Sequence, residues 1–151
     1  MWKQNSIFFE PRPKGFYLIT NEILKEIDYI KSLKTGILFL FIKHTSASIT
    51  LNENSDQLVR EDFESYFNRI VPENQSHYKH SNEGPDDMPA HLKTSILGSS
   101  TFVPIKNGKL TLGRWQGIYL CEHRTNGPTR NLIITVMGSV WYYSSFFTLS
   151  H

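Results

Sequence analysis

Six consecutive apolar residues, Ile37 to Ile42, constrain the fold more than any other segment of this sequence. The run is rich in residues that favour strands, and Gly36 and Lys43 bound it. A half-exposed strand alternates apolar with polar residues, so an uninterrupted run predicts a strand that is buried on both faces. Other elements must pair with this strand and cover it, which places it at the centre of a sheet.

Six further segments have the composition and the bounding turns of strands. Asn107-Gly108 separates two of them, and this dipeptide favours the type I′ turn of a β-hairpin. Thr125-Asn126-Gly127-Pro128 joins the last two. The predicted strands are Ser6–Glu10, Gly15–Ile19, Ser100–Ile105, Lys109–Leu112, Trp115–His123 and Asn131–Met137.

Three segments carry helix signals. Residues 20–36 begin with a capping Thr and end with a Gly stop, and residues 54–72 begin with Asn-Ser as alternative caps and end at a Pro. Residues 89–98 predict a shorter helix, with Pro in its first turn and Gly at its end. The predicted buried stripes are Ile23, Leu24, Ile27 and Ile30 in the first helix, and Leu58, Val59, Phe63, Tyr66, Phe67 and Ile70 in the second.

These elements predict a single compact α+β domain with a mixed, largely antiparallel sheet or sandwich, two main helices and one short helix. A chain of 151 residues suits one domain. The net charge is +2 with both signs dispersed, so a nucleic-acid partner is not indicated, whereas the basic neighbourhood from Arg114 to Arg130 fits a small anion. No apolar run approaches a membrane span, and Cys121 is the only cysteine, so we expect a cytoplasmic protein.

The segment from His44 to Thr50 carries a polar pattern of period two. Alternation along a strand would send His44, Ser46, Ser48 and Thr50 to one face, opposite Ala47, Ile49 and Leu51. Such a face is either a solvated polar surface or part of a binding site, and periodicity alone does not decide between them.

Histidines suggest a metal site. His44, His80 and His91 are the candidate ligands, because three imidazoles with one open position form a catalytic zinc site, although their spacing matches no local zinc motif. His80 lies in the long polar segment from Glu73 to Met88, which suits a functional loop. His123 is a possible fourth donor. The alternative is that all of these histidines are polar surface residues.

Charged residues form the remaining candidates. Glu122 falls on an apolar strand face, so its carboxylate pairs with Arg124 or Arg130, binds a metal, or acts in catalytic proton transfer. Asp86-Asp87 either holds Mg²⁺ against a diphosphate or caps the short helix through Asp87. Phosphate contacts are predicted for Lys93, Arg124 and Arg130.

The order and spacing of several motifs resemble the YjbQ family from Met1 to about Gly138. The family signature usually has Thr where this chain has Arg114, which leaves ligand preference at that turn open. The motifs that carry the resemblance are His44-Thr45-Ser46-Ala47-Ser48, Leu51-Asn52-Glu53-Asn54, Val71-Pro72, His80, Glu83-Gly84, Asp86-Asp87-Met88-Pro89, His91-Leu92-Lys93, Leu97-Gly98-Ser99, Gly113 to Ile118 and Glu122-His123-Arg124.

The resemblance implies a YjbQ-like domain over residues 1–138, assembled as a homotrimer. Residues 139–151 extend beyond the family's usual end, and their crowded aromatic residues predict that this extension packs on its own domain or at a subunit interface. It also implies a secondary thiamine-phosphate synthase, which joins hydroxymethylpyrimidine diphosphate to thiazole phosphate and releases pyrophosphate. The roles expected from this hypothesis are metal ligation by His44, His80 and His91, catalysis by Glu122, and substrate binding by Ser46, Ser48, Asn52, Lys93, Arg124 and Arg130.

The leading hypothesis is therefore a small metal-binding enzyme, with zinc as the expected cofactor and Mg²⁺ as a possible companion of the diphosphate. The alternative is a non-catalytic metal- or anion-binding protein. A purely structural oligomeric module would leave the polar strand face from His44 to Thr50 without a purpose.

Overall fold

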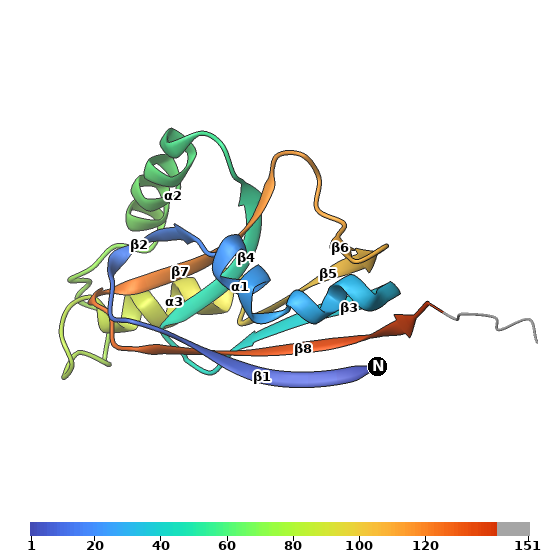
Figure 1. The fold of residues 1–151 in the computed structure, drawn as a ribbon. Coiled ribbons are helices and arrows are strands. Elements are labelled where there is room, and N and C mark those ends of the chain that lie inside the picture. Colours follow the sequence, from blue (N-terminus) through green and yellow to red (C-terminus); the bar gives the residue numbers. More distant parts are fainter. Residues whose placement is uncertain (142–151) are drawn as a thin grey trace, which may run out of the picture.

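A computed structural model describes residues 1–141 of the chain as two antiparallel sheets packed face to face, with helices around them (Figure 1). The larger sheet has the order β1-β8-β3-β5-β6 and the smaller one the order β2-β7-β4. The predicted single α+β domain is confirmed, and all strand pairs in these residues are antiparallel. The strands are β1 (Trp2–Phe9), β2 (Pro13–Leu18), β3 (Leu33–Ile42), β4 (Ala47–Glu53), β5 (Ser100–Lys106), β6 (Lys109–Leu110), β7 (Gln116–Asn126) and β8 (Arg130–Val140).

The apolar run lies in β3, between β8 and β5, so its predicted central position is confirmed. The prediction that both faces of this strand are buried is wrong. Leu38 and Leu40 are fully buried, but Ile37 is 43% exposed and Phe41 41% exposed, because nothing in the described part of the chain covers the outer face of this sheet. Gly36 lies inside β3 rather than at a helix end.

The first helix is shorter than its apolar spacing predicts. Helix α1 covers Thr20–Glu26, and a 3₁₀ turn, η1, covers Asp28–Ser32 before the chain enters β3. Ile23, Ile27 and Ile30 are nevertheless buried as predicted. They join the core between the two sheets, which Leu38, Ile49, Ile118, Leu132 and Ile134 also fill.

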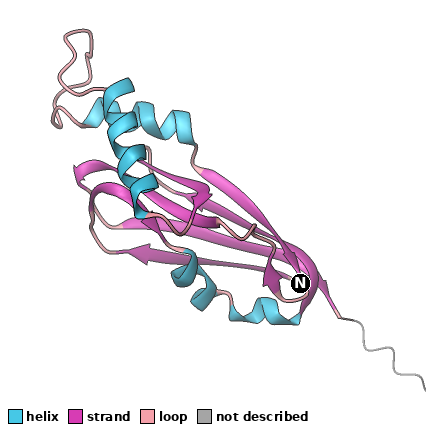
Figure 2. Cartoon of the chain, turned by 90° about the horizontal axis from the view of Figure 1, so that it is seen from above, coloured by secondary structure: helices cyan, strands magenta, loops and turns pink. Residues whose placement is uncertain are grey.

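Helices α2 (Gln57–Ile70) and α3 (Asp87–Leu97) cover the outer face of the smaller sheet (Figure 2). Two rings of α2 pack on Phe16 of β2, with ring centroids 5.4 Å away for Phe63 and 6.0 Å for Phe67. The cap of α2 is Asp56, whose carboxylate accepts the Leu58 N–H at 2.9 Å, in place of the predicted Asn-Ser. The predicted stripe is buried only in part, since the exposed residues include Leu58, Tyr66 and Ile70.

The last strands follow the prediction closely. Asn107 and Gly108 have φ values of 51° and 76°, as the predicted type I′ turn between β5 and β6 requires. Strand β8 continues to Val140, so the first two residues of the predicted extension, Ser139 and Val140, belong to the sheet. The predicted packing of residues 142–151 lies outside the described residues. No helix within residues 1–141 is long and apolar enough to cross a membrane.

The outer face of the larger sheet is apolar, and we call it the open sheet face. No helix lies beyond it in Figure 1, where β1 and β8 form the lower edge of the fold. Three of its aromatic residues are more than half exposed: Trp2 at 73%, Phe102 at 64% and Phe8 at 63%. Register places Phe102 beside Phe39, and Ile37 beside Met137. Gln4 and Ser6 interrupt these apolar residues on β1, but so many exposed aromatic side chains on one face are typical of an interaction face.

Candidate metal centre

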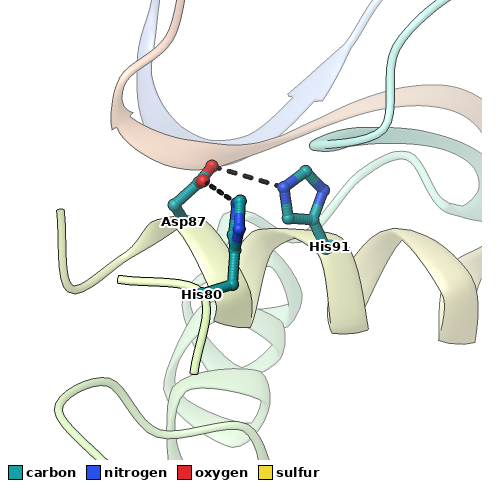
Figure 3. Close-up of side chains that lie close together, drawn as sticks. All are labelled: His80, Asp87 and His91. Atoms are coloured by element: carbon teal, nitrogen blue, oxygen red, sulfur yellow. Dashed lines mark hydrogen bonds and ion pairs between the residues drawn. The ribbon is translucent and has the colours of Figure 1, made fainter. Parts of the chain in front are cut away.

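Two histidines and one aspartate converge where the loop before α3 meets the first turns of that helix (Figure 3). Asp87 and His91 are four residues apart on α3, so they share one helical face, and the loop brings His80 onto them. One ligand atom from each of the three lies within 4.8 Å of the others. Ligands of one tetrahedral zinc lie roughly 3.3 Å apart, so small side-chain rotations would close the cluster on an ion.

Hydrogen bonds select the nitrogen that each histidine offers. The Nδ1–H of His91 donates to the backbone carbonyl of Thr45 at 2.9 Å, which leaves Nε2 with its lone pair, 3.5 Å from the Asp87 carboxylate. His80 approaches the same carboxylate through Nε2, at 2.6 Å. A carbonyl that fixes the tautomer of a histidine is the usual second partner of a metal ligand.

His44 is not part of this cluster. It lies in the loop between β3 and β4, and its Nε2 accepts the backbone N–H of Asn131 at 2.8 Å. Burial, and secondarily the charge of Arg130, lowers the pKa of His44, so the ring is neutral and carries its hydrogen on Nδ1. Neither nitrogen then offers a lone pair to a metal. The cluster contains the carboxylate of Asp87 and no third imidazole; the sequence predicted Asp87 only as a Mg²⁺ ligand or as a cap of the short helix.

Arg124 neutralises the acidic pair at the start of α3. Its Nε donates to Asp86 at 3.0 Å, its Nη1 to Asp87, and its Nη2 to the carbonyl of Glu83 at 2.8 Å. Burial alone would raise the pKa of Asp86, but hydrogen bonds from the Thr125 N–H and from Arg124 outweigh it and lower that pKa. Arg124 therefore faces carboxylates rather than a free phosphate position, and neither aspartate caps α3 through its side chain.

Glu122 and Arg130 form a buried bidentate ion pair. Both contacts, from Nε to Oε2 and from Nη2 to Oε1, measure 2.6 Å, and both residues are at most 2% exposed. The Arg124 N–H adds a third bond to the carboxylate, and Ser46 accepts from Arg130 at 3.1 Å. A Cβ at Gly127 would lie 2.3 Å from this carboxylate, so only glycine fits beside it. Of the roles considered for Glu122, the structure therefore has the ion pair with Arg130.

Ser48 of β4, His123 of β7 and Lys93 of α3 are almost completely buried where the helices cover the smaller sheet. The Ser48 hydroxyl bonds Nε2 of His123, and the Lys93 ammonium donates to the side-chain oxygen of Asn68 at 2.7 Å. Burial lowers the pKa of His123 to about 3, and burial followed by the charge of Lys14 lowers that of Lys93. His123 is therefore an internal polar residue, neither the predicted surface histidine nor a fourth ligand of the cluster.

Similar proteins share both this sequence and this architecture. The profile of the family described as UPF0047 protein YjbQ-like matches residues 5–139. UPF0047 protein YjbQ of Salmonella typhimurium is 49% identical over 138 residues, which cover 91% of this chain and 99% of that protein. The chain belongs to the UPF0047 YjbQ-like family. The matched range contains each of the candidate ligands His44, His80, Asp87 and His91.

Solved structures of this family have the same fold. A YbjQ-like protein of unknown function from Sulfolobus solfataricus superposes with a TM-score of 0.80 at 25% identity, covering 92% of this chain and 99% of that one. An uncharacterised YjbQ/UPF0047 protein from Clostridium acetobutylicum gives 0.72 at 36% identity, covering 89% and 99%. The family resemblance seen in the sequence motifs is thus confirmed.

Two further candidates lie apart from these contacts. Asn52 is exposed on β4, and its side-chain oxygen accepts the N–H of its neighbour Glu53 at 2.8 Å. Arg114, the departure from the YjbQ signature, stacks over Trp115 at 4.9 Å in the exposed segment before β7. Asn52 and Arg114 make no contact with the cluster of His80, Asp87 and His91 among the described hydrogen bonds and ion pairs.

Proposed function

We propose that this chain is a metal-binding enzyme with weak secondary thiamine-phosphate synthase activity. The observation that carries the metal proposal is that His80, His91 and Asp87 each bring one ligand atom within 4.8 Å of the others, and the Nε2 atoms of both histidines face the carboxylate. Two imidazoles and a carboxylate suit zinc, with positions left open for substrate, and also suit other transition metals. The thiamine-related activity rests on the resemblance to the YjbQ family.

The proposed reaction forms a bond between the thiazole nitrogen and the pyrimidine methylene carbon and breaks the bond from that carbon to the diphosphate oxygen. Negative charge develops on the leaving pyrophosphate. A divalent ion held by His80, Asp87 and His91 would stabilise that charge. The chain itself must hold the two substrates in line and exclude water from the reacting carbon, because orientation supplies much of the rate in such a transfer.

The geometry changes several of the predicted roles. Asp87 takes the ligand position expected for His44, while Glu122 and Arg130 serve as a structural pair. Arg124 orients Asp87 by a charge-assisted hydrogen bond, which is the role of a residue behind a metal ligand. Zinc fits this site better than Mg²⁺, because two of the three donors are imidazoles.

The second candidate is a protein that binds a metal or an anion without catalysis. One observation favours it: Glu122, expected to be catalytic, is fully engaged by Arg130 and the Arg124 N–H. In that case the protein binds a metal ion at His80, Asp87 and His91 for storage or sensing and catalyses no reaction.

A homotrimer is the proposed assembly, and the open sheet face is the proposed contact between copies. Exposed Trp2, Phe8 and Phe102 support this choice, because burial of aromatic side chains contributes strongly to subunit interfaces. We place the protein in the cytoplasm, where the single cysteine, Cys121, remains a buried thiol whose pKa is raised by burial.

Complementation tests the activity. The full chain is expressed in a host that lacks thiamine-phosphate synthase and is plated without thiamine. Wild type should restore slow growth, His80→Ala and His91→Ala should not, and His77→Ala should behave like wild type because His77 is exposed outside the cluster. Growth that is absent for wild type, or equal in all four strains, contradicts the enzymatic proposal.

A further inference from the structure

Two hollows adjoin at His44, and together we call them the His44 trough. The first has a volume of about 330 Å³, and His44, His91, Thr94 and Ser95 line it. The second, of about 600 Å³, continues from His44 and Ser99 to Lys43 and Arg130. Because His91 borders the first hollow, the trough begins at the proposed metal position and leads away from it.

The wall of the trough suits an anion. Within the described chain, its lining includes hydroxyl groups, imidazoles and the cation Lys43, but no aspartate or glutamate; Arg130 also borders it, with its charge already paired to Glu122. The hydrogen bond from the Asn131 N–H occupies His44 Nε2, so the neutral ring has an Nδ1–H donor left. A pocket with several donors and one unpaired cation, and without carboxylates in its lining, is complementary to phosphate oxygens.

Thr94 provides an independent observation. It borders the first hollow and is 8% exposed, and its hydroxyl oxygen is closed off from solvent and has no hydrogen-bond partner in the described part of the chain. A buried hydroxyl without a partner costs free energy, so a ligand that bonds it would remove that cost. A helical threonine usually bonds the carbonyl one turn earlier, and Thr94 does not do so here.

We propose that the His44 trough binds a phosphate group of the substrate, with His44 Nδ1–H as one donor and the Thr94 hydroxyl, turned into the hollow by a rotation about χ1, as the other. The phosphorylated substrate is taken from the proposed function, so this inference rests on that function. The anion site then lies away from Arg124, because Arg124 is already paired with Asp86 and Asp87. His44 is then a substrate-binding residue rather than a metal ligand.

Titration of the full chain with inorganic phosphate tests this, by calorimetry and by phosphorus NMR, first with a chelator and then with one equivalent of zinc. Thr94→Val and His44→Phe should each weaken phosphate binding at least about tenfold, since a hydrogen bond to a charged group is lost. Zinc affinity should not change in either variant. Thr101→Val, on β5 outside both hollows, is the matched control and should bind phosphate like wild type.

Thr94→Val should also keep or raise the melting temperature, because it removes an unsatisfied buried hydroxyl at nearly constant shape. This variant decides the matter if His44→Phe does not fold. Phosphate affinity within twofold of wild type in Thr94→Val, or no phosphate binding by wild type in either condition, overturns the inference and leaves the metal proposal standing. Weakened phosphate binding in a chain that takes up no zinc supports the trough and contradicts the metal proposal.

Discussion

The Nδ1 atom of His91 lies 2.9 Å from the carbonyl oxygen of Thr45, which joins helix α3 to the loop between β3 and β4. This bond gives the His44-to-Ser48 motif a role that its side chains alone do not suggest. Its backbone fixes the tautomer of His91 and turns Nε2 towards Asp87. The motif thus acts on the proposed metal position through a carbonyl group, one residue after His44.

His44→Ala should leave the zinc affinity of the protein within about twofold of wild type. The reason is that Nε2 of His44 already accepts the Asn131 N–H and does not face Asp87. Zinc titration in a competing chelator measures this. If His44→Ala lowered the zinc affinity as much as His91→Ala does, His44 would be a metal ligand after all.

Arg130→Met should lower the free energy of unfolding by roughly 3–5 kcal/mol, because it leaves the buried Glu122 carboxylate without its ion-pair partner. Urea denaturation gives the value. The double variant Glu122→Leu with Arg130→Met should recover part of the loss, and Arg69→Met, at an exposed position on α2, should stay within about 0.5 kcal/mol of wild type. Equal stability of Arg130→Met and Arg69→Met would show that the pair contributes nothing.

Stability should fall as the pH drops below 6.5. The pKa of His123 is about 3 in the folded chain against an ordinary value of 6.5, so between these values the unfolded state binds a proton that the folded state does not. The resulting loss is up to about 1.4 kcal/mol per pH unit, and above pH 6.5 this histidine has no effect. The lowered pKa of His44 acts in the same direction.

His123→Gln should flatten this pH dependence by about one proton, whatever its stability at neutral pH. His77→Gln, at an exposed position in the loop after α2, is the control and should keep the wild-type slope. Urea denaturation at pH 4.5, 5.5, 6.5 and 7.5 measures the slopes. Parallel curves for His123→Gln and wild type would mean that folding does not lower the pKa of His123.

Phe102→Asp should disrupt the proposed trimer, because it places a charge on the open sheet face beside Phe39. Light scattering coupled to size exclusion should give about three times 17.5 kDa for wild type and a smaller mass for the variant. Trp115→Asp changes an equally exposed aromatic residue before β7, away from that face, and should retain the wild-type mass. A wild-type monomer, or an unchanged mass for Phe102→Asp, contradicts this contact.

Local patterns predicted much of this fold. The apolar run identified the central strand β3, and Asn107-Gly108 identified the β5–β6 hairpin, since each feature depends on a few neighbouring residues. What covers a strand is not local. The outer face of β3 stayed open and α1 ended at Glu26, and neither result is encoded within the segments themselves.

The site was harder to predict for the same reason. His80 and His91 do come together, but His44 is turned away by a backbone N–H that lies 87 residues along the chain. Asp87 was missed because the predicted helix began at Pro89, whereas α3 begins at Asp87 and puts it four residues before His91 on one face. The sequence also did not show that Arg124 and Arg130 are paired, because their partners Asp86 and Glu122 come close to them only in the folded chain.

The metal content of untagged protein tests the central proposal most directly. Elemental analysis, followed by zinc titration of the chelator-treated chain, should find close to one transition metal ion per chain. That ion should be lost in His80→Ala, whose half-exposed side chain can be removed without disturbing the core, and kept in His77→Ala. Binding should weaken in acid, because protons compete for the imidazole nitrogens. Protein that is free of metal as purified, and whose melting temperature no added divalent ion raises, would contradict a metal site at His80, Asp87 and His91.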